Sequence, residues 1–410
     1  MSEHVVFIEM SGSGAGQKAI EYALRRGYDV TLLTARSTAA VPPAVAAICQ
    51  FDTADADAVA TRVLELHRDH AVNGVTTTHD LYVPQAARAA EELGLPGMGY
   101  TAAAGVRNKH LMRQRLAVTA PQLNPAFRLV ENENDAVGFA RQRGYPVIAK
   151  PPNAFDSWNV ERLDEEADVR RYMRAAGGWT LNPAGQPIDQ GVLMEEFVDG
   201  SEHSVETAQA QGGPRQLLAV TTKELAGADG RHFAEIGVAL PVDGPTAEAL
   251  FGAVSTALDA LGVTCGVVHT ECRVRDGQVV IIEVNPRLVG EMTGSHMIEL
   301  ALGADPIAQV VDIALGAAPP WAPTRARGAA SYGICAPASG RFAEITNVAE
   351  LAAVPGVAVV REMIERGAAC CVPPRSNGDF VGRVVTTADT VEQALELARE
   401  VARRADVRLE

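Results

Sequence analysis

The sequence predicts a protein of class α/β plus α+β with more than one domain. At 410 residues the chain is too long for a single ordinary core, so two to four domains or subdomains are expected. Strand and helix patterns alternate over the first hundred residues, which favours a parallel sheet. Further along, an Asp-Gly hairpin signal and several short strands near the end indicate antiparallel pairing.

Composition restricts the classes of function. The chain is 47% hydrophobic and 21% charged, as in globular proteins, and its formal net charge of −15 disfavours nucleic acid as a partner. The N-terminus runs directly into a strand-like segment without a basic lead, so we expect no signal peptide, no membrane association and a cytoplasmic location. The six cysteines lack Cys-x-x-Cys spacing and are expected to be free, buried thiols, the adjacent Cys370 and Cys371 included.

Residues 1–105 are predicted to form an N-terminal α/β domain. Its strands are HVVFIEM, DVTLLT and NGVTTT, and its helices cover about residues 14–26, 55–70 and 84–93. This repetition implies parallel strands with right-handed crossovers. The first turn, SGSGAGQ, is similar to a dinucleotide fingerprint, but Gly12, Gly14 and Gly16 are wrongly spaced because residue 17 is Gln. We interpret it as a tight turn whose amides can face a small anion.

Two lysines in the next segment are candidates for contact with an anion. Lys109 lies in the helical stretch NKHLMRQRL, which breaks at Pro121, and Lys150 ends the apolar strand of YPVIAKPP after a helix over residues 134–143. A charged lysine at the end of an apolar strand is costly to bury without an anion. Contact with phosphate is therefore expected, and an ordinary exposed lysine is the alternative.

A strand, a short bridge and a second strand follow in VLMEEFVDGSEHSVE, after a connecting segment NAFDSWN and a helix over about residues 164–175. Glu195 and Glu196 precede the bridge, and Glu202 begins the second strand. A backbone bridge beside such carboxylates can take an adenine edge and ribose hydroxyls, while ordinary surface acids are the alternative. Later strands carry Lys223, and His232 with Glu235, before a helix over residues 246–261.

The stretch from residue 267 to residue 291, VVHTECRVRDGQVVIIEVNPRLVGE, is the strongest signal in the chain. Its two apolar runs flank Asp276-Gly277, which is typical of a β-hairpin. A two-residue turn would place Glu271 opposite Ile282 and point it away from Glu283. We predict instead a three-residue loop with a left-handed Gly277, in which Glu271 pairs with Ile281 and Glu283 pairs with His269.

In that register Glu271, Glu283 and Asn285 share one face of the hairpin. Carboxylate and amide oxygens suit a hard cation such as Mg²⁺, and Arg287 adds a fork-shaped donor for phosphate or carboxylate. The alternative is a polar face that is merely solvated.

After the hairpin, two helices separated by Gly303 lead to a Pro-rich boundary near residues 319–323. Residues 321–410, with short strands and a helix over 390–404, are expected to form a small α+β cap.

Taken in order, these segments resemble the ATP-grasp superfamily, and within it the carboxylate-amine ligases related to L-amino acid ligases and biotin carboxylase. The resemblance rests on NKHLM, VIAKP, MEEFVDGSEHSVE, the strand of Glu271, and EVNPR followed by Gly290. It implies a pre-ATP-grasp domain over 1–105 and an ATP-grasp domain over 106–320. In that domain two subdomains, one of them a lid at about 145–200, would hold ATP between antiparallel sheets.

The resemblance also implies roles for individual residues. ATP as cosubstrate would be contacted by Lys109, Lys150, Ser157, Glu195, Glu196, Phe197, Val198 and Glu202, and Mg²⁺ or Mn²⁺ would be held by Glu271, Glu283 and Asn285. Arg287 and Lys150 would be catalytic, and a carboxylate and an amine substrate would meet Arg287, Gly290, Glu291, His203, His232 and His296. A homodimer is expected. The chain departs from the pattern in two places: the loop NAFDSWN is usually glycine-rich, and Gly237-Val238 stands where related ligases often carry Gly-His.

The expected reaction is an ATP-dependent ligation that forms an amide or peptide bond through an acyl phosphate. The sequence contains no G-x-S-x-G, H-E-x-x-H or Walker A motif, and ligation of this type needs no side-chain nucleophile. Two alternatives stay open. One is carboxylation or formyl transfer through a carboxy- or formyl-phosphate, and the other is nucleotide binding without catalysis.

Overall fold

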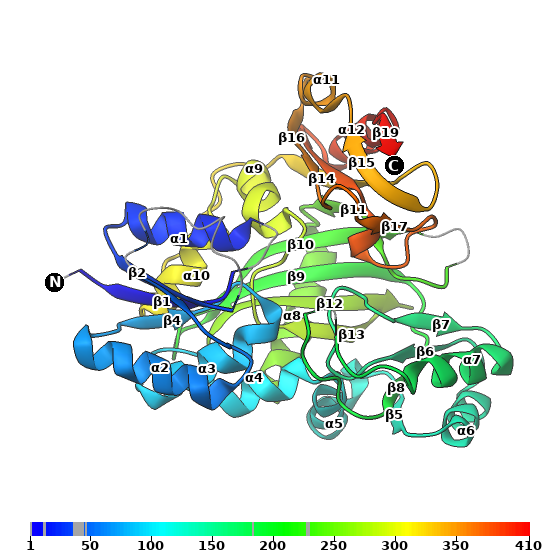
Figure 1. Cartoon of the computed structure of the whole chain (residues 1–410), viewed down its shortest axis with the longest axis horizontal. Coiled ribbons are helices and arrows are strands. Elements are labelled where there is room, and N and C mark those ends of the chain that lie inside the picture. The colour runs from blue at the N-terminus through cyan, green and yellow to red at the C-terminus, as the bar shows by residue number, and fades with distance from the viewer. Residues whose placement is uncertain (1, 11–13, 36–44, 46, 183, 227–229) are drawn as a thin grey trace.

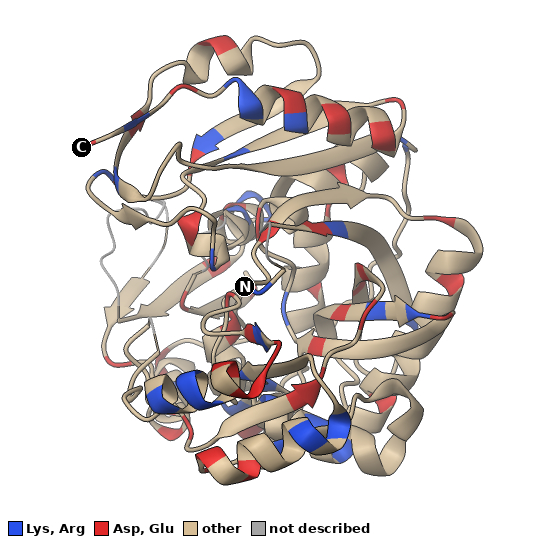
Figure 2. Ribbon diagram, turned by 90° about the vertical axis from the view of Figure 1, so that its right-hand side faces the viewer, with Lys and Arg blue, Asp and Glu red and all other residues tan. Residues whose placement is uncertain are grey.

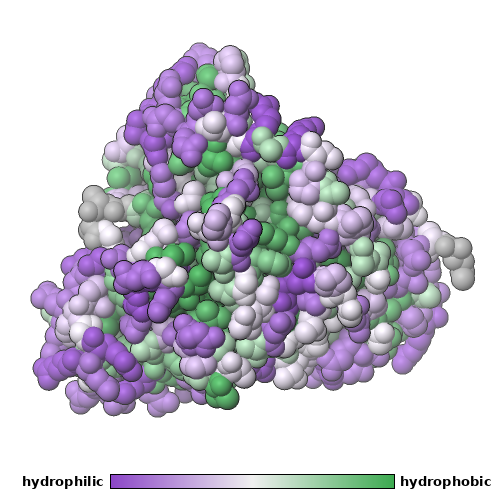
Figure 3. All heavy atoms as spheres, turned by 180° about the vertical axis from the view of Figure 1, so that it is seen from behind, coloured by the Kyte–Doolittle hydropathy of each residue, from purple (hydrophilic) through white to green (hydrophobic). Residues whose placement is uncertain are grey.

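The computed structural model describes residues 2–10, 14–35, 45, 47–182, 184–226 and 230–410. Four sheets organise these residues, with the N-terminal elements at one end and the C-terminal elements above the middle of the molecule (Figure 1). Seen from behind, the surface is mainly hydrophilic, and hydrophobic residues gather towards the middle (Figure 3). Within the described segments, no helix is both long enough and apolar enough to cross a membrane.

The N-terminal sheet is parallel throughout, as predicted, with strand order β3-β2-β1-β4. Strand β3 escaped prediction because it has only four residues and is partly exposed. The glycine-rich turn cannot be compared with the prediction, because residues 11–13 lie outside the described part. The elements of this domain are β1 (His4–Ile8), α1 (Ala15–Arg25), β2 (Asp29–Thr34), β3 (Ala47–Gln50), α2 (Ala56–Asp69), β4 (Gly74–Thr76), α3 (Val83–Glu92) and α4 (Tyr100–Arg107).

A small antiparallel sheet, order β5-β8-β6-β7, forms a subdomain that we call the lid, and it begins at β5, before the start at about residue 145 that was predicted. Its apolar core includes Phe139 of α6 and Tyr172 of α7, so both helices pack on the sheet. At the junction with the N-terminal domain lies α5, whose first turn is capped by the side chain of Asn108. The elements are α5 (Lys109–Thr119), β5 (Phe127–Val130), α6 (Glu133–Arg143), β6 (Val147–Lys150), β7 (Glu161–Leu163), α7 (Glu166–Ala176) and β8 (Val192–Glu196).

The central sheet is antiparallel and has eight strands in the order β13-β12-β9-β10-β11-β14-β18-β16. Helices α4, α5 and α8 cover one face and share with it the largest apolar core. The opposite face is polar along β9, β12 and β13 and looks towards the lid. The elements are β9 (Ser201–Gln209), β10 (Arg215–Leu225), β11 (Glu235–Leu240), α8 (Gly244–Leu261), β12 (Gly266–Arg275), β13 (Gln278–Asn285), a π-helix (Thr293–Met297), α9 (Ile298–Leu302) and α10 (Pro306–Ala314).

The C-terminal part is joined to the central sheet rather than standing apart from it. Its strands β14, β18 and β16 extend that sheet from β11, so the Pro-rich boundary near residue 320 does not separate two sheets. Strands β17, β15 and β19 form a further small sheet. The elements are β14 (Gly328–Ile334), β15 (Gly340–Ile345), α11 (Val348–Ala352), β16 (Val357–Glu362), β17 (Ala369–Cys370), β18 (Gly382–Ala388), α12 (Val391–Arg403) and β19 (Val407–Leu409).

The cysteines agree with the prediction that they are free thiols. None of the six forms a disulfide. Cys265, Cys272 and Cys370 are buried, whereas Cys49, Cys335 and Cys371 are partly exposed, so burial holds for half of them.

Candidate functional site

The β12–β13 hairpin has the predicted common face but not the predicted turn. Arg275 pairs with Gln278, so Asp276 and Gly277 form a two-residue turn, and both have positive φ, 52° and 77°. That combination matches the twist of the flanking strands, which explains why it prevails over a three-residue loop. The predicted pairing of Glu271 with Ile281 and of Glu283 with His269 is therefore wrong.

A β-bulge restores the common face. Between the pairs Cys272–Ile281 and Glu271–Glu283, strand β13 carries one extra residue, Ile282. The bulge shifts the register by one, so Glu271 lies directly opposite Glu283. The buried Arg113 of α5 donates to the carbonyl oxygens of Ile281 and Ile282, at 2.7 and 2.8 Å, and so satisfies backbone acceptors at the bulge.

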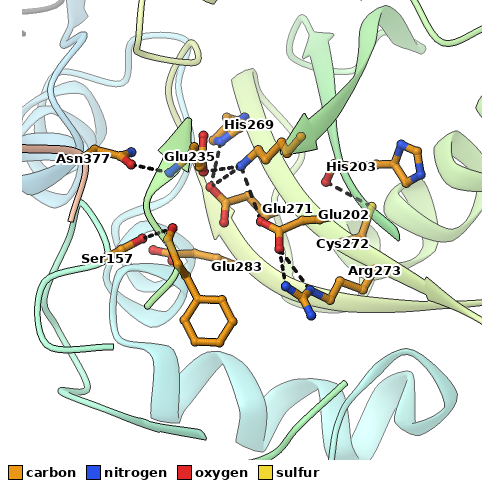
Figure 4. A network of polar contacts seen from close by, with 12 residues as sticks. Ser157, Glu202, His203, Glu235, His269, Glu271, Cys272, Arg273, Glu283 and Asn377 are labelled. Atoms are coloured by element: carbon orange, nitrogen blue, oxygen red, sulfur yellow. Dashed lines mark hydrogen bonds and ion pairs between the residues drawn. The ribbon is translucent and has the colours of Figure 1, made fainter. Parts of the chain in front are cut away.

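Four neighbouring strands place a buried lysine among three carboxylates on the polar face. The ammonium of Lys223 on β10 lies 2.6 Å from Glu235 on β11, 3.0 Å from Glu271 on β12 and 3.9 Å from Glu202 on β9. Figure 4 shows these carboxylates turned towards one another. Lys223 is one of only four lysines in the chain, against 32 arginines, and it is buried like Lys109 and Lys150.

Charge interactions in this cluster shift several pKa values. Burial would lower the pKa of His269, but Glu206 at 2.5 Å and Glu271 at 3.1 Å raise it to about 9. Burial would raise the pKa of Glu271, but Lys223 and His269 hold it well below its usual range. The pKa of Glu235 is raised by burial and by the neighbouring carboxylates, against the effect of Lys223. The cluster is thus largely charged and internally compensated.

A first cavity lies between the lid and the polar face of the central sheet. Its empty volume is about 760 Å³, including the part open to solvent. All eight residues predicted for ATP contact line this cavity: Lys109, Lys150, Ser157, Glu195, Glu196, Phe197, Val198 and Glu202. The bridge from β8 to β9 therefore forms one wall of the cavity. Lys150 reaches it from β6 of the lid, and Lys109 reaches it from the start of α5.

The two lysines of this cavity are held by carboxylates. Lys150 lies 2.8 Å from Glu195, which also accepts from Arg113 at 2.7 Å. Burial would raise the pKa of Glu195, but these two cations lower it to about 2. Lys109 lies 2.9 Å from Glu283 and donates to the carbonyl oxygen of Ala154 at 2.7 Å. A predicted phosphate-binding lysine and a predicted metal-binding carboxylate are thus in direct contact.

A second cavity opens beside the first and has an empty volume of about 1350 Å³, again including open solvent. It is lined by Asn285 and by Arg287, Gly290 and Glu291, for which substrate contact stays a prediction. Five residues line both cavities: Phe155, Ser157, Glu235, Glu271 and Glu283. The two cavities therefore meet at the metal-type carboxylates and at the loop between β6 and β7.

The three histidines predicted for substrate contact line neither of these two cavities. His203 projects from the opposite face of β9, because strand residues alternate, and its ring bonds to Thr221 and Ser201. Figure 4 shows the ring away from the carboxylate cluster. His232 precedes β11 and is only partly buried. His296 bonds to Ser295 in the π-helix, and burial with the nearby Lys18 and Arg361 lowers its pKa to about 4. Substrate contact for these three is a prediction that the geometry does not support.

The loop after Lys150 adopts a conformation suited to glycine without containing any. Asp156, Ser157 and Asn159 all have a φ of 53°. Side chains other than glycine rarely adopt this left-handed conformation, with Asp and Asn the best tolerated. The loop thus has a glycine-like backbone although it departs from the glycine-rich pattern, at the expense of local strain.

Two buried charged residues of the site, Asp80 and Lys223, were given no role by the sequence analysis. Asp80, which lies between β4 and α3 in the N-terminal domain, is buried and reaches Arg107 at 3.5 Å and Arg287 at 3.9 Å. In the amide orientation that satisfies its neighbours, Asn285 donates to Asp80 at 3.2 Å. No local pattern marks such a residue, because two of its three partners, Arg287 and Asn285, lie about two hundred positions away in the chain. The scarcity of lysine was a usable signal for Lys223.

The donor set fits a hard divalent cation at Glu271, Glu283 and Asn285. All three present oxygen donors from one face, and all three line the second cavity. The tightest group of carboxylates among the described residues, Glu202 with Glu235 and Glu271, is instead compensated by Lys223. Acidic and basic residues occur on both the helices and the strands (Figure 2).

Three family models match successive parts of the chain. Residues 20–97 match the ATP-grasp N-terminal domain, residues 143–296 the ATP-grasp domain, and residues 334–410 the L-amino acid ligase C-terminal domain 2.

Solved structures resemble the whole chain. An L-amino acid ligase from Bacillus licheniformis superposes with a TM-score of 0.83 at 25% identity, covering 100% of this chain and 99% of that one. A phosphoribosylglycinamide synthetase from Anaerococcus prevotii, at 16% identity and a TM-score of 0.72, covers both chains completely and shows the shared fold.

Relatives found by sequence match a smaller share of the chain. An uncharacterized protein of Sinorhizobium fredii is 25% identical over 341 residues, which are 82% of this chain and 68% of that protein. The carbamoyl phosphate synthase large chain of Vibrio parahaemolyticus is 26% identical over 250 residues, and these cover 58% of this chain but only 22% of that enzyme's length.

Proposed function

The chain belongs to the ATP-grasp superfamily, and on that premise we propose that it is an ATP-dependent carboxylate-amine ligase that joins amino acids. The observation that carries the proposal is the meeting of two cavities across five shared residues. One cavity has the lysines and the strand bridge that suit a nucleotide. The other has Arg287, a fork-shaped donor that suits a carboxylate.

In this proposal the γ-phosphate of ATP lies at the shared wall, near Ser157 and Lys109. Arg287 holds the substrate carboxylate so that one oxygen faces that phosphate, and the carboxylate attacks the γ-phosphorus to give an acyl phosphate and ADP. An amine then attacks the acyl carbon, and phosphate leaves as the amide forms. Positioning and charge neutralisation supply most of the rate, as in other phosphoryl transfers.

Glu271, Glu283 and Asn285 are the residues that would hold Mg²⁺ or Mn²⁺, which neutralises phosphate charge when bound. Lys223 keeps Glu271 ionised and fixed, since their contact is 3.0 Å. Asp80 fixes the amide of Asn285, which leaves the amide oxygen free for the cation. The expected homodimer stays a prediction.

An ADP-release screen tests the proposal. Purified protein with ATP and Mg²⁺ is offered all pairs of the common amino acids, and any product is identified by mass. The proposal expects ADP release that requires two amino acids and a product lighter than their sum by one water. Release that requires bicarbonate or formate and no amino acid would favour the carboxylase or formyl-transfer alternative. ATP binding by calorimetry with no ADP from any pair would favour a non-catalytic nucleotide-binding protein.

A further inference from the structure

Ligation through an acyl phosphate also requires a group that removes a proton from the amine substrate. At neutral pH an amine substrate arrives mostly as an ammonium ion, which has no lone pair with which to attack. A group beside the acyl carbon must take its proton, and a carboxylate can serve as this general base. The base must be free to accept a proton, so a carboxylate already held in an ion pair is poorly suited.

Most carboxylates around the second cavity are held in this way. Glu235 and Glu271 contact Lys223, and Glu283 contacts Lys109 at 2.9 Å. Across the cavity, Glu291 contacts the buried Arg383 at 2.5 Å, and Asp80 lies 3.5 Å from Arg107.

Asp156 is the remaining carboxylate of the cavity lining, and its side chain is exposed to the cavity. Across the described residues it forms no hydrogen bond and no ion pair.

Asp156 also stands at the place where the acyl phosphate would form. Its neighbours in the chain, Phe155 and Ser157, line both cavities, whereas Asp156 lines only the second. It therefore lies on the substrate side of the junction, within the loop expected to cover the phosphates, and Arg287 lines the same cavity. Its φ of 53° is a conformation that glycine would adopt more easily. A strained residue other than glycine at such a place is typical of a functional side chain.

We propose that Asp156 is the general base that deprotonates the attacking amine, an inference that rests on the ligase function proposed above. The ammonium N–H gives its proton to the Asp156 carboxylate, and the freed lone pair forms the C–N bond at the acyl carbon. The C–O bond to phosphate then breaks, and its electron pair leaves with the phosphate. The second proton of the nitrogen passes to the departing phosphate, so the products are the amide and hydrogen phosphate.

The charges around Asp156 suit this role. The cavity walls reduce hydration of the carboxylate although solvent reaches it, and this partial desolvation, with Glu291, Asp80 and Glu235 nearby, raises the pKa of Asp156 to about 6. Arg287 acts in the opposite direction. The group is therefore mostly ionised at neutral pH and yet basic enough to hold a proton during the reaction.

The test compares two nucleophiles on two matched variants. Hydroxylamine is largely unprotonated at neutral pH and traps acyl phosphates without needing a base. Asp156→Asn keeps the size and the left-handed tolerance of the side chain but removes its basicity. Asp276→Asn is the control, because Asp276 has a φ of 52° in the hairpin turn and lines neither cavity. Asp156→Gly is a second variant, whose backbone suits the loop without any side chain.

For both Asp156 variants we expect ligation with the amino-acid amine to fall by about 100-fold or more, while hydroxylamine-dependent ADP release stays within roughly threefold of wild type. The acid limb of the wild-type kcat profile, near pH 6, should disappear in Asp156→Asn. Undiminished ligation by Asp156→Asn, or an equal loss with both nucleophiles, would overturn the assignment. Wild-type protein that releases no ADP with either nucleophile would refute the ligase function itself, and the general base with it.

Discussion

Replacing Lys223 by methionine tests the claim that a buried lysine holds the carboxylates of the polar face together. The side chain of Lys223 is almost fully buried, and its ammonium contacts Glu235 at 2.6 Å and Glu271 at 3.0 Å. Methionine has a similar length but no charge, so it leaves buried carboxylates uncompensated. Removing one partner of a buried ion pair costs about 3–5 kcal/mol. Against a total stability of about 5–15 kcal/mol, such a loss is easily measured.

Urea denaturation at pH 8 and pH 5 is the assay. Contact with the carboxylates raises the pKa of Lys223, so the wild-type lysine is charged at both values. In Lys223→Met the carboxylates take up protons as the pH falls, and the deficit should therefore be smaller at pH 5 than at pH 8. Arg62→Met is the control, because Arg62 and Glu65 form an exposed pair that contributes at most about 1 kcal/mol. A Lys223→Met deficit no larger than the control's would refute the reasoning.

Three further predictions concern the same site. Glu283→Ala should abolish ATP-dependent ligation, measured as ADP release, and near-normal turnover would show that Glu283 is no metal ligand. Arg287→Lys keeps the charge but loses the fork, so the KM for the carboxylate substrate should rise roughly tenfold; an unchanged KM would count against the role. His269, with its pKa raised to about 9 by Glu206 and Glu271, should stabilise the metal-free fold fully below pH 6.5 and lose that effect as the pH rises through 9. Stability curves of wild type and His269→Gln should therefore converge at high pH, and parallel curves would contradict the assignment.

Most helices and strands could be predicted from the sequence, because the patterns that indicate them involve only neighbouring residues. The helix beginning at Lys109, capped by Asn108, and the strand ending at Lys150 agree with prediction to within a residue or two. The hairpin was located correctly for the same reason. The strand register within the hairpin was predicted wrongly, because the bulge at Ile282 is stabilised by Arg113, which is far away in the chain. A local sequence pattern does not indicate a contact with so distant a residue.

The residues of the candidate site also fall into those that local motifs indicate and those that they do not. Residues on the motifs, such as Glu283 and Arg287, line the expected cavities. Asp80, at the start of a short 3-10 helix, and Asp156, in a loop, were missed because neither position indicates in the sequence which cavity the side chain faces. His203 was misassigned because only the strand register decides which face of the sheet a residue occupies.

Isotope transfer from the substrate tests the central claim most directly. An amino acid labelled with ¹⁸O in its carboxylate is incubated with ATP, Mg²⁺ and the amine partner found in the ADP screen, and the released phosphate is analysed by mass. The acyl-phosphate route predicts that each phosphate carries one ¹⁸O, because the oxygen that attacks the γ-phosphorus leaves with it. Unlabelled phosphate formed together with the amide product would contradict the account.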